Sequence, residues 1–584
     1  MIPKTAKRRA FACAMLAILS STAAAQSYEA VAPVPPPSRQ RPAAAPMPAP
    51  STSDAVQVAV AKLQGLAFFA DGETTNRRAA TAIRHGPIVA TGLPLIDEDF
   101  LRGFEADIGK PLTFAQLANI RAAVVQRYRE AGEPLVDVYV PEQDVTNGVV
   151  RIAVATFRAG NVIARGNRHF SDALLLREMP ITRGAPILDA DVAKGLALLN
   201  ANPYRHVDVL YVPGAERNAT DVVLQTDDRL PLRVTAGYND AGVPQLGRDR
   251  FFAGIDYGNL FGLDQQIAWQ TTVSNDFFSG NPPIEGRPNR SRFIAHSFRY
   301  VAPLPWFDRV ELFGLFARST PRLPDNYGQT GISTQLSFRY DWLLPVVAGW
   351  QQQAQIGYDF KRSNNNLEFG GMQVFHSNAH THQFSLAYDA IRMDTLGQSH
   401  VNVAVVVSPG HLDADNEQAA YNTARLGATP RYAYTRISAQ RNVMVGAGFS
   451  ASALALLQWT PNTLLPAEEI GLGGDDSVRG YAPYVVQGDR GWNIQTELRA
   501  PSLAFSGGDM ALQPFIFFDA GHVWNRIDQP AEAGNAALAS VGAGLRFEIG
   551  RFVSVRCTYG QPLRTATPGG SKAPLGQIFA VFGS

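Results

Sequence analysis

The second half of this chain alternates apolar and polar residues over hundreds of positions, and this pattern limits its fold more than any other feature. From about Leu232 onward, short alternating segments are separated by Gly, Asn, Asp and Pro, as in Gln266 to Val273, Phe293 to Tyr300 and Thr334 to Tyr340. Because successive residues of a strand point to opposite faces of a sheet, this alternation predicts β-strands. No sustained helical period interrupts them.

Residues 229–584 are long enough to close into a membrane barrel. At about 10 residues per tilted strand plus turns, these roughly 350 residues fit on the order of 16 antiparallel strands. Aromatic residues gather near segment ends, as interfacial girdles require, and charged residues make up only 18% of the chain. A soluble array of β-sandwiches is the alternative, but the unbroken run favours a mainly β protein with a closed, antiparallel transmembrane barrel.

The N-terminus has the layout of a secretory signal. Four basic residues precede the apolar run from Phe11 to Leu19, and Ala23-Ala24-Ala25 offers a cleavage site. The run is too short to span a bilayer as a helix, so residues 1–25 are interpreted as a signal peptide, with an uncleaved anchor as the alternative. Cys13 lies in this signal, and Cys557 is expected to be a packing residue in a strand.

A linker and two small α/β units lie between the signal and the barrel. Residues 26–55 are rich in Pro, Ala and Ser and cannot build a core, so they are interpreted as a linker. Segments 56–157 and 158–228 then repeat one order of elements. The first unit is predicted to begin with a strand within 56–69 or 87–91. A helix follows, which is capped by Thr113 and Gln116 and closed by Gly132. A strand at Leu135 to Val140, a hairpin turn at Asn147-Gly148 and a return strand at Val149 to Phe157 complete the unit. The predicted elements of the second unit are a strand at 161–165, a short helix after Ser171, a helix from about Asp189 to Asn200, and a hairpin of His206 to Val212 with Asp221 to Thr226.

One charged motif stands out within the barrel region. Residues 473–481 read GGDDSVRGY, and the guanidinium of Arg479 is costly in a membrane-patterned segment unless it is paired. Forty residues later, Asp519 is a lone carboxylate in the apolar strand Phe517 to Gly521. We therefore expect Arg479 and Asp519 to meet inside the barrel. The alternative is a loop arginine and a lumen aspartate that never meet.

Three stretches point to one family. They are Leu198 to Pro203 with Tyr211 to Gly214, Leu465 through Tyr481 to Asp489, and Phe518 to Gly521. The first resembles the second POTRA domain of two-partner secretion transporters of the haemolysin secretion/activation type. The second resembles that family's inward-folded loop, here around 465–490, and the third resembles the strand motif that follows it. The resemblance covers about Lys62 to the C-terminus.

This resemblance implies both a fold and a function. It implies that 56–157 and 158–228 are two periplasmic POTRA domains and that 229–584 is a barrel of about 16 strands in the bacterial outer membrane. It also implies export of one large, usually β-helical partner of haemolysin, adhesin or filamentous type. The expected partners are that secreted polypeptide, outer-membrane lipid and the barrel assembly machinery. A net charge of +1 gives no attraction to nucleic acid, and a monomer is expected.

The chain departs from the family pattern at both ends. Residues 26–54 are too rich in proline for the pore-plugging helix with which family members often begin. Family barrels usually end on an aromatic residue that the assembly machinery reads. Here the expected equivalent is Phe582, displaced by two residues from the C-terminus.

The resemblance assigns roles to the motif residues. Arg479 and Asp519 are expected to form a charge-assisted latch that fixes the loop in the lumen and could switch during transport. The remaining motif positions are Gly473, Gly474, Val478, Gly480 and Tyr481 in the loop, and Phe518 and Gly521 in the strand. The glycines are expected at tight turns. Asp475, Asp476 and Asp489 are interpreted as solvated loop acids rather than a cation site.

The exported partner is expected to dock on two strands. An extended chain could add to exposed sheet edges through main-chain hydrogen bonds, and the alternative is a protected edge that binds nothing. The candidate edge residues are Leu135, Val136, Val138 and Val140 in the first unit, and His206, Val207, Val209 and Tyr211 in the second.

Nothing in the sequence indicates catalysis. It has no Gly-rich phosphate loop, no G-x-S-x-G elbow and no metal-type cluster, so we expect no enzyme, no cofactor and no metal. His376, His380 and His382 are interpreted as a loop or lumen surface. Without a nucleotide site, folding of the partner outside the cell is the suggested energy source. Two alternatives remain open, an outer-membrane protein assembly factor of the same superfamily and a passive porin.

Overall fold

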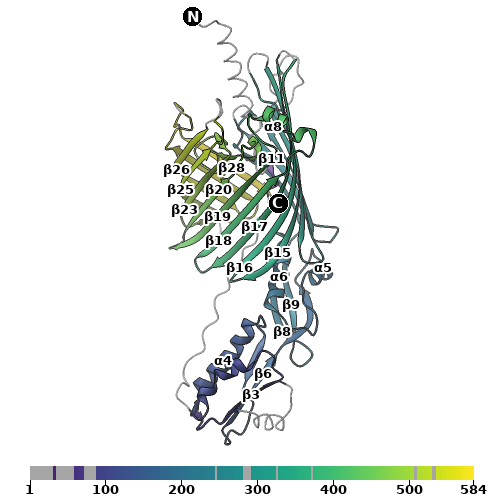
Figure 1. The fold of residues 1–584 in the computed structure, drawn as a ribbon, viewed down its shortest axis with the longest axis vertical. Coiled ribbons are helices and arrows are strands. Elements are labelled where there is room, and N and C mark those ends of the chain that lie inside the picture. The colour runs from purple at the N-terminus through teal and green to yellow at the C-terminus, as the bar shows by residue number, and fades with distance from the viewer. Residues whose placement is uncertain are drawn as a thin grey trace. The chain divides into compact units, whose positions relative to one another are not determined.

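The computed structural model describes residues 31–34, 58–71, 87–243, 246–279, 291–323, 327–369, 372–505, 509–528, 534–567 and 569–583 (Figure 1). The predicted signal peptide and most of the predicted linker lie outside these residues. The chain forms two compact units, 37–230 and 231–584, the second joined by residues 1–36, and each is described by itself.

The first small sheet of unit 37–230 has four strands in the order β3-β2-β6-β5. The elements of residues 58–156 are β1 (Val58–Val60), β2 (Gly65–Ala70), β3 (Ile88–Thr91), α3 (Glu98–Arg102), β4 (Leu112–Thr113), α4 (Phe114–Glu130), β5 (Val136–Tyr139) and β6 (Val149–Thr156). Strands β1 and β4 pair as a separate two-stranded sheet. Thr113 caps α4, and Gln116 completes the capping box, as predicted. Ile120, Val124 and Tyr128 of α4 are buried against the sheet.

Two predictions for this sheet need revision. The structure contains both candidate first strands, as the parallel neighbours β2 and β3. The tight hairpin at Asn147-Gly148 was wrong, because β5 ends at Tyr139 and β6 begins only at Val149. Gly148 does turn the chain with φ +72, and a Cβ there would meet the carbonyl oxygen of Lys62 at 2.6 Å. It therefore closes a longer loop.

The second small sheet has three strands in the order β7-β9-β8. Its elements are β7 (Arg158–Arg165), α5 (Asp172–Arg177), α6 (Asp189–Leu199), β8 (Arg205–Pro213) and β9 (Ala219–Asp228). Each was predicted within a few residues. Leu174, Leu175 and Leu199 of the helices pack with Val207, Val222 and Leu224 of the sheet. The short helix begins after Ser171 as predicted, and Ser171 caps it by accepting a hydrogen bond from the Leu174 amide.

Residues 231–584 form a closed antiparallel barrel of 16 strands, which confirms the predicted fold class. The strands are β10 (Leu232–Asn239), β11 (Arg250–Leu260), β12 (Gln265–Ser274), β13 (Phe293–Pro303), β14 (Arg309–Ser319), β15 (Tyr327–Val347), β16 (Trp350–Phe369), β17 (Met372–Asp394), β18 (Gly397–Ser408), β19 (Tyr432–Gly446), β20 (Phe449–Trp459), β23 (Arg490–Arg499), β24 (Leu503–Phe505), β25 (Met510–Trp524), β26 (Asn535–Ile549), β27 (Val553–Pro562) and β28 (Leu575–Gly583). Short β24 continues β23 along β25, and β28 pairs with β10 to close the ring.

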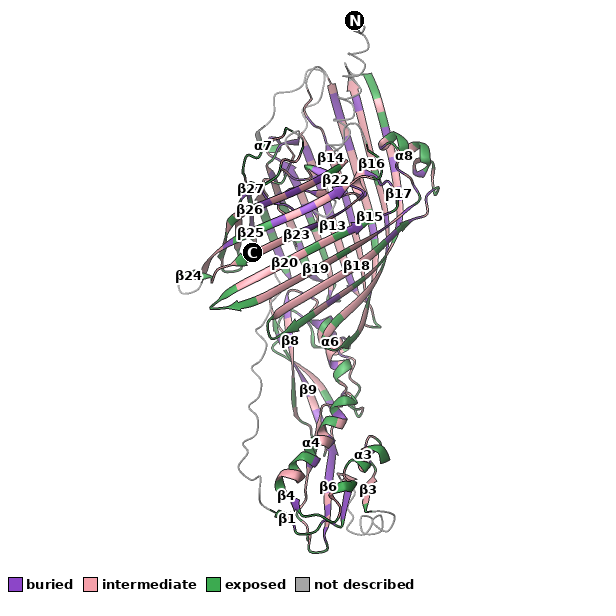
Figure 2. Cartoon of the chain, turned by 60° about the vertical axis from the view of Figure 1, so that its left-hand side comes forward, coloured by how far each residue is buried: buried purple, intermediate pink, exposed green. Residues whose placement is uncertain are grey.

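The barrel reverses the burial pattern of a soluble protein. Figure 2 shows that burial varies along its strands. On β10, apolar Val234 is 52% exposed while Arg233 is 8% and Thr235 3% exposed. The apolar face therefore points outward and the polar face inward, as a membrane barrel requires. The strands β15 to β17 are the longest (Figure 1). Among the described residues, no helix is long and apolar enough to cross a membrane.

Candidate functional site

Residues 460–489 connect β20 to β23 and carry the nine-residue motif. Two short strands, β21 (Ile470–Leu472) and β22 (Val486–Gly488), pair antiparallel to make a stalk (Figure 2). The stalk packs on the wall, where Gly521 leaves room for the Leu472 side chain, because a Cβ there would approach Leu472 Cδ2 to 2.9 Å. We call residues 460–489 the lumen loop.

Arg479 at the tip of the lumen loop reaches Asp519 on the inner face of β25. Its Nε donates to Asp519 Oδ2 and its Nη2 to Oδ1, both at 2.7 Å, and its backbone amide donates to Oδ2 at 3.1 Å. The Asp519 side chain is fully buried and that of Arg479 is 3% exposed. This two-point geometry is the strongest form of an arginine–carboxylate pair.

Glu497 and Phe517 complete the setting of Arg479, and sequence reasoning missed both. Arg479 Nη1 donates to Glu497 Oε1 at 2.5 Å, and its guanidinium carbon lies 3.9 Å from the centre of the Phe517 ring. Glu497 also accepts from Arg499 and Arg546, each at 2.8 Å. Phe518, which the sequence analysis named, is 45% exposed on the outer face. Strand alternation could have identified Phe517, since it shares a face with Asp519.

Glycines let the tip lie directly on the wall. Gly480 has φ +86, and a Cβ on it would meet the backbone of Gly560 on β27 at 2.8 Å. A Cβ on Gly560 would in turn meet Gly480 Cα at 2.6 Å. Gly473 and Gly474 also have positive φ values, +102 and +90, which favour glycine. The tip and β27 therefore touch backbone to backbone.

The two apolar residues of the motif anchor the same contact. Val478 is fully buried in a cluster with Ile470, Leu472 and Val486 of the stalk. The Tyr481 hydroxyl lies 2.8 Å from the carbonyl oxygens of both Ala539 and Arg564. The tip is thus fixed to three parts of the wall beyond β25.

The three acids Asp475, Asp476 and Asp489 of the lumen loop differ in their surroundings. Asp489 is fully buried and accepts from Arg425 at 2.7 Å, so its interpretation as a solvated acid was wrong. Asp475 pairs with Arg556 of β27. Asp476 is exposed. A buried carboxylate needs a partner, and the partner of Asp489 comes from another loop that no local sequence signal connects to it.

Two of the three histidines His376, His380 and His382 contact an acid, and the third contacts an amide. His380 Nδ1 and His382 Nε2 lie 2.9 and 2.8 Å from Asp413 Oδ2, and His376 is hydrogen-bonded to Asn366. No group of three or more His, Cys, Asp or Glu able to hold a metal ion occurs among the described residues.

A short part of the predicted linker lies against the inner wall of the barrel. Ser297 Oγ donates to the Val31 carbonyl oxygen at 2.6 Å, and the Val34 amide donates to Gln270 Oε1 at 3.2 Å. Val31 is buried with Phe293 and other apolar residues of the wall. Residues 31–34 are therefore not a free linker, because buried polar groups of β12 and β13 provide hydrogen-bond partners for their backbone.

The two candidate docking strands are edges of their sheets, since β5 and β8 each end a strand order. Their outer sides differ. On β5, Arg121 Nε donates to the Val138 carbonyl oxygen at 2.6 Å. On β8, the Asn200 side chain pairs with both backbone groups of Val207, at 2.7 and 3.0 Å. On β5 the occupied residue is Val138, and the candidate residues Leu135, Val136 and Val140 lie on either side of it. On β8 the occupied residue is Val207, and His206 precedes it.

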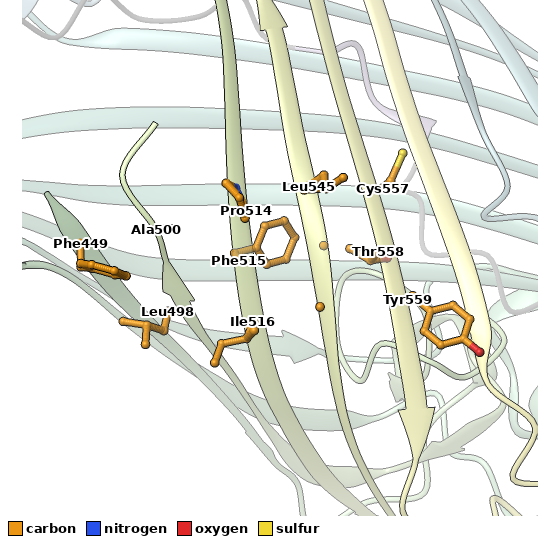
Figure 3. Close-up of a pocket in the computed structure, with 12 residues that line it drawn as sticks. Phe449, Leu498, Ala500, Pro514, Phe515, Ile516, Leu545, Cys557, Thr558 and Tyr559 are labelled. Atoms are coloured by element: carbon orange, nitrogen blue, oxygen red, sulfur yellow. The ribbon is translucent and has the colours of Figure 1, made fainter. Parts of the chain in front are cut away.

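An apolar groove of about 530 Å³ lies on the outer side of the barrel (Figure 3). Leu498, Ile516, Leu545 and Tyr559 of four strands form its walls, and each is more than a third exposed. Cys557 also lines it. The side chains that line the groove are mostly apolar, and none of them forms an ion pair with another lining residue. The groove therefore fits a hydrocarbon chain better than a polar ligand.

Comparisons with known proteins agree with this geometry. Residues 218–547 match the family described as haemolysin secretion/activation protein ShlB/FhaC/HecB, and residues 89–156 match the POTRA domain of ShlB type. The chain is 19% identical over 476 residues to the outer membrane transporter CdiB of Dickeya dadantii (strain 3937), covering 77% of each chain. It is 20% identical over 476 residues to the heme/hemopexin transporter protein HuxB of Haemophilus influenzae (strain 86-028NP), covering 78% of this chain and 79% of that one. The solved structure of CdiB from Escherichia coli has the same fold, with a TM-score of 0.73 and 18% identity over 92% of this chain and 93% of that one.

Proposed function

The chain belongs to the family of haemolysin secretion/activation proteins ShlB/FhaC/HecB, and on that premise we propose which polypeptide it exports and where that polypeptide docks. It is an outer-membrane two-partner secretion transporter, and members of this family transport a partner protein rather than catalyse a reaction. The observation that carries this conclusion is the family match over 218–547, which includes most of the barrel and the whole lumen loop.

The partner is one large secreted protein of haemolysin or adhesin type, with a β-helical fold. Support comes from relatives that are named for such cargo, including the hemolysin transporter protein ShlB of Serratia marcescens. The transporter acts as a monomer, with 56–157 and 158–228 as POTRA domains in the periplasm. A chain that must cross the barrel in extended form can offer its main chain to a sheet edge before transport.

Deletion of this chain, followed by comparison of proteins in the culture medium, tests the proposal. Loss of a single large β-helical polypeptide, restored by the intact chain, is the expected result. A general loss of outer-membrane barrels would instead favour an assembly factor, and an unchanged medium with altered uptake of small solutes would favour a porin.

Of the two docking edges, we place the partner on β8. Alternate residues of an antiparallel strand point their backbone groups to the same side. Since Val207 points away from β9 to Asn200, the backbone groups of Val209 and Tyr211 point away from β9 as well. On the shorter β5, Arg121 already occupies Val138 in the middle of the edge. The far half of β8 therefore offers the longer open edge.

Two further partners follow from the outer surface. Outer-membrane lipid covers the apolar outer face and fills the groove of Figure 3 with an acyl chain. The barrel assembly machinery reads Phe582, which lies on β28 and is 49% exposed.

The pair of Arg479 and Asp519 acts as a latch of the transport path. It holds the tip of the lumen loop against β25, and its release lets the tip leave the wall during transport. Arg479 and Asp519 are buried and pair with each other only when the loop is docked. The docked loop is therefore one defined conformation.

A further inference from the structure

The lumen loop leaves the barrel wall and returns to it through a narrow neck, residues 464–469 and 486–489. Gln458 of β20 joins the two arms, since its Nε2 donates to the carbonyl oxygens of Glu468 at 2.9 Å and Asp489 at 3.1 Å. The Leu464 amide donates to Asp489 Oδ1 at 2.7 Å. These contacts close the base of the loop independently of its tip.

A guanidinium from a different loop is inserted into this neck. Arg425 follows α8 (Gln418–Ala424) in the connection between β18 and β19. Its Nη1 donates to Asp489 Oδ1 and to the Leu464 carbonyl oxygen, both at 2.7 Å, and its Nη2 lies 2.8 Å from Glu469 Oε1. The three side chains are at most 4% exposed. One buried cation thus bridges both arms of the neck.

The surrounding contacts make this a built site rather than a chance pair. Glu468 of the neck pairs with Lys361 of β16 at 2.7 Å and accepts from the Tyr434 hydroxyl at 3.0 Å. Leu464 and Leu465 pack in one buried cluster with Tyr421 of α8. The connection 409–431 is therefore docked over the neck through apolar and ionic contacts together.

We propose that Arg425 is a positioning residue that clamps the neck of the lumen loop, so that the loop is held by two separate locks. Arg425 contacts Asp489, Leu464 and Glu469 of the neck. The tip instead contacts Glu497 of β23, Asp519 of β25 and Gly560 of β27. Release of the Arg479 latch frees the tip on a fixed base. Movement of the whole loop additionally requires the connection 409–431 to lift Arg425 out of the neck.

The test measures each lock with its own thiol in the full-length protein. Cys557→Ser removes the native thiol of the barrel, Ala467→Cys reports on the neck and the near-isosteric Ser477→Cys reports on the tip. Arg425→Ala is expected to raise the rate of labelling by a bulky, membrane-impermeant maleimide at position 467 by about tenfold or more, since it removes the cation that Asp489 and Glu469 share. Arg479→Ala is expected to raise labelling at 477 by a similar factor and to leave 467 nearly unchanged.

Arg431→Ala is the matched control, because Arg431 lies in the same connection but is exposed. It is expected to change neither rate. Equal increases at 467 and 477 in Arg425→Ala would show general loosening and overturn the proposal, as would an unchanged rate at 467. If Arg425→Ala does not give a heat-modifiable barrel, Glu469→Gln replaces it, with a smaller rise expected at 467 alone. No partner is needed, so failure here is distinguishable from failure of the proposed export.

Discussion

The geometry of Arg479 explains why an arginine, rather than a lysine, lies at the tip of the lumen loop. One planar guanidinium donates three hydrogen bonds, two to Asp519 and one to Glu497, while its face lies on Phe517. A lysine would keep the charge but could not bond in this fork or stack on the ring. Removing the cation from a buried pair typically costs about 3–5 kcal/mol, because the remaining charge stays uncompensated.

We therefore predict that Arg479→Ala leaves the barrel inserted but lowers partner export at least about tenfold, since the docked loop loses its main polar anchor. Arg479→Lys is expected to be nearly as defective, because only the charge is restored. The measurement is partner protein in the medium, set against the amount of heat-modifiable barrel in the membrane. Arg551→Ala, at the turn between β26 and β27, is the control. Normal export by Arg479→Ala would refute the latch.

How far the sequence predicts this site depends on the residue. Arg479 and Asp519 could be singled out because each charge is costly in an apolar strand pattern, and the family resemblance joined them. Glu497 could not be singled out from the sequence, because it occupies an ordinary polar position of an alternating strand. Only the register that places Glu497 opposite Phe517 brings it to the guanidinium. Gly560 was likewise missed, since its role depends on contact with Gly480.

At the scale of elements, caps and periodicity were more informative than turns. The capping box of α4 was predicted from Thr113 and Gln116 because it is a local hydrogen-bonding pattern. The turn at Asn147-Gly148 and both strands were predicted at the right residues, but the turn closes a longer loop instead of a tight hairpin. The loop between β5 and β6 is fixed instead by its packing against Lys62, which sequence spacing does not reveal.

The edge of β8 offers a sharp test of strand addition. Tyr211 pairs with Val222, and its amide points away from β9. Tyr211→Pro therefore removes a donor that only an added strand would use, and edge strands tolerate proline. We predict about a five- to tenfold weaker affinity for the N-terminal part of the partner, because one net hydrogen bond contributes about 1 kcal/mol. Titration of that fragment against the full-length chain measures it.

Tyr211→Ala separates main chain from side chain at the same position. It keeps the amide and loses only the exposed ring, so its affinity is expected to fall less than that of Tyr211→Pro. If both variants bind like the parent, the partner does not use this edge. If only Tyr211→Ala weakens binding, recognition is through the ring rather than through strand addition.

At the scale of the whole molecule, the sequence predicted where the chain divides into small α/β units and barrel. It did not predict where residues 31–34 lie. The reversal of burial on β10 is visible as alternation in the sequence. Residues 31–34 were predicted to be linker because a segment rich in Pro, Ala and Ser cannot build a core. Composition cannot show that Ser297 and Gln270 of the wall would bind this extended backbone, since those contacts join residues more than 200 positions apart.

One contact between the two small α/β domains is built around a carboxylate. Asp71 follows β2 of the first domain and accepts from the Tyr139 hydroxyl at 2.8 Å. It also accepts from Arg217 at 2.8 Å and from Asn218 at 3.1 Å, both in the turn between β8 and β9 of the second domain. Burial acts to raise the pKa of Asp71, but the hydrogen bonds from Tyr139, Asn218 and Arg217 outweigh it, and the pKa lies below its ordinary value of 3.8.

This shift sets the pH dependence of the junction. Because the folded pKa of Asp71 is depressed, its contribution to stability is fully present above the unfolded pKa and is lost as pH falls through the folded pKa. We predict that Asp71→Asn speeds amide exchange in β5 and in the turn between β8 and β9 near neutral pH, with a loss of about 1–3 kcal/mol in local protection. Comparing variant and parent at each pH cancels the intrinsic pH dependence of exchange. The difference should hold down to about pH 4 and shrink below it. A difference that is absent at neutral pH, or that grows on acidification, would mean that the ionised carboxylate does not join the two domains.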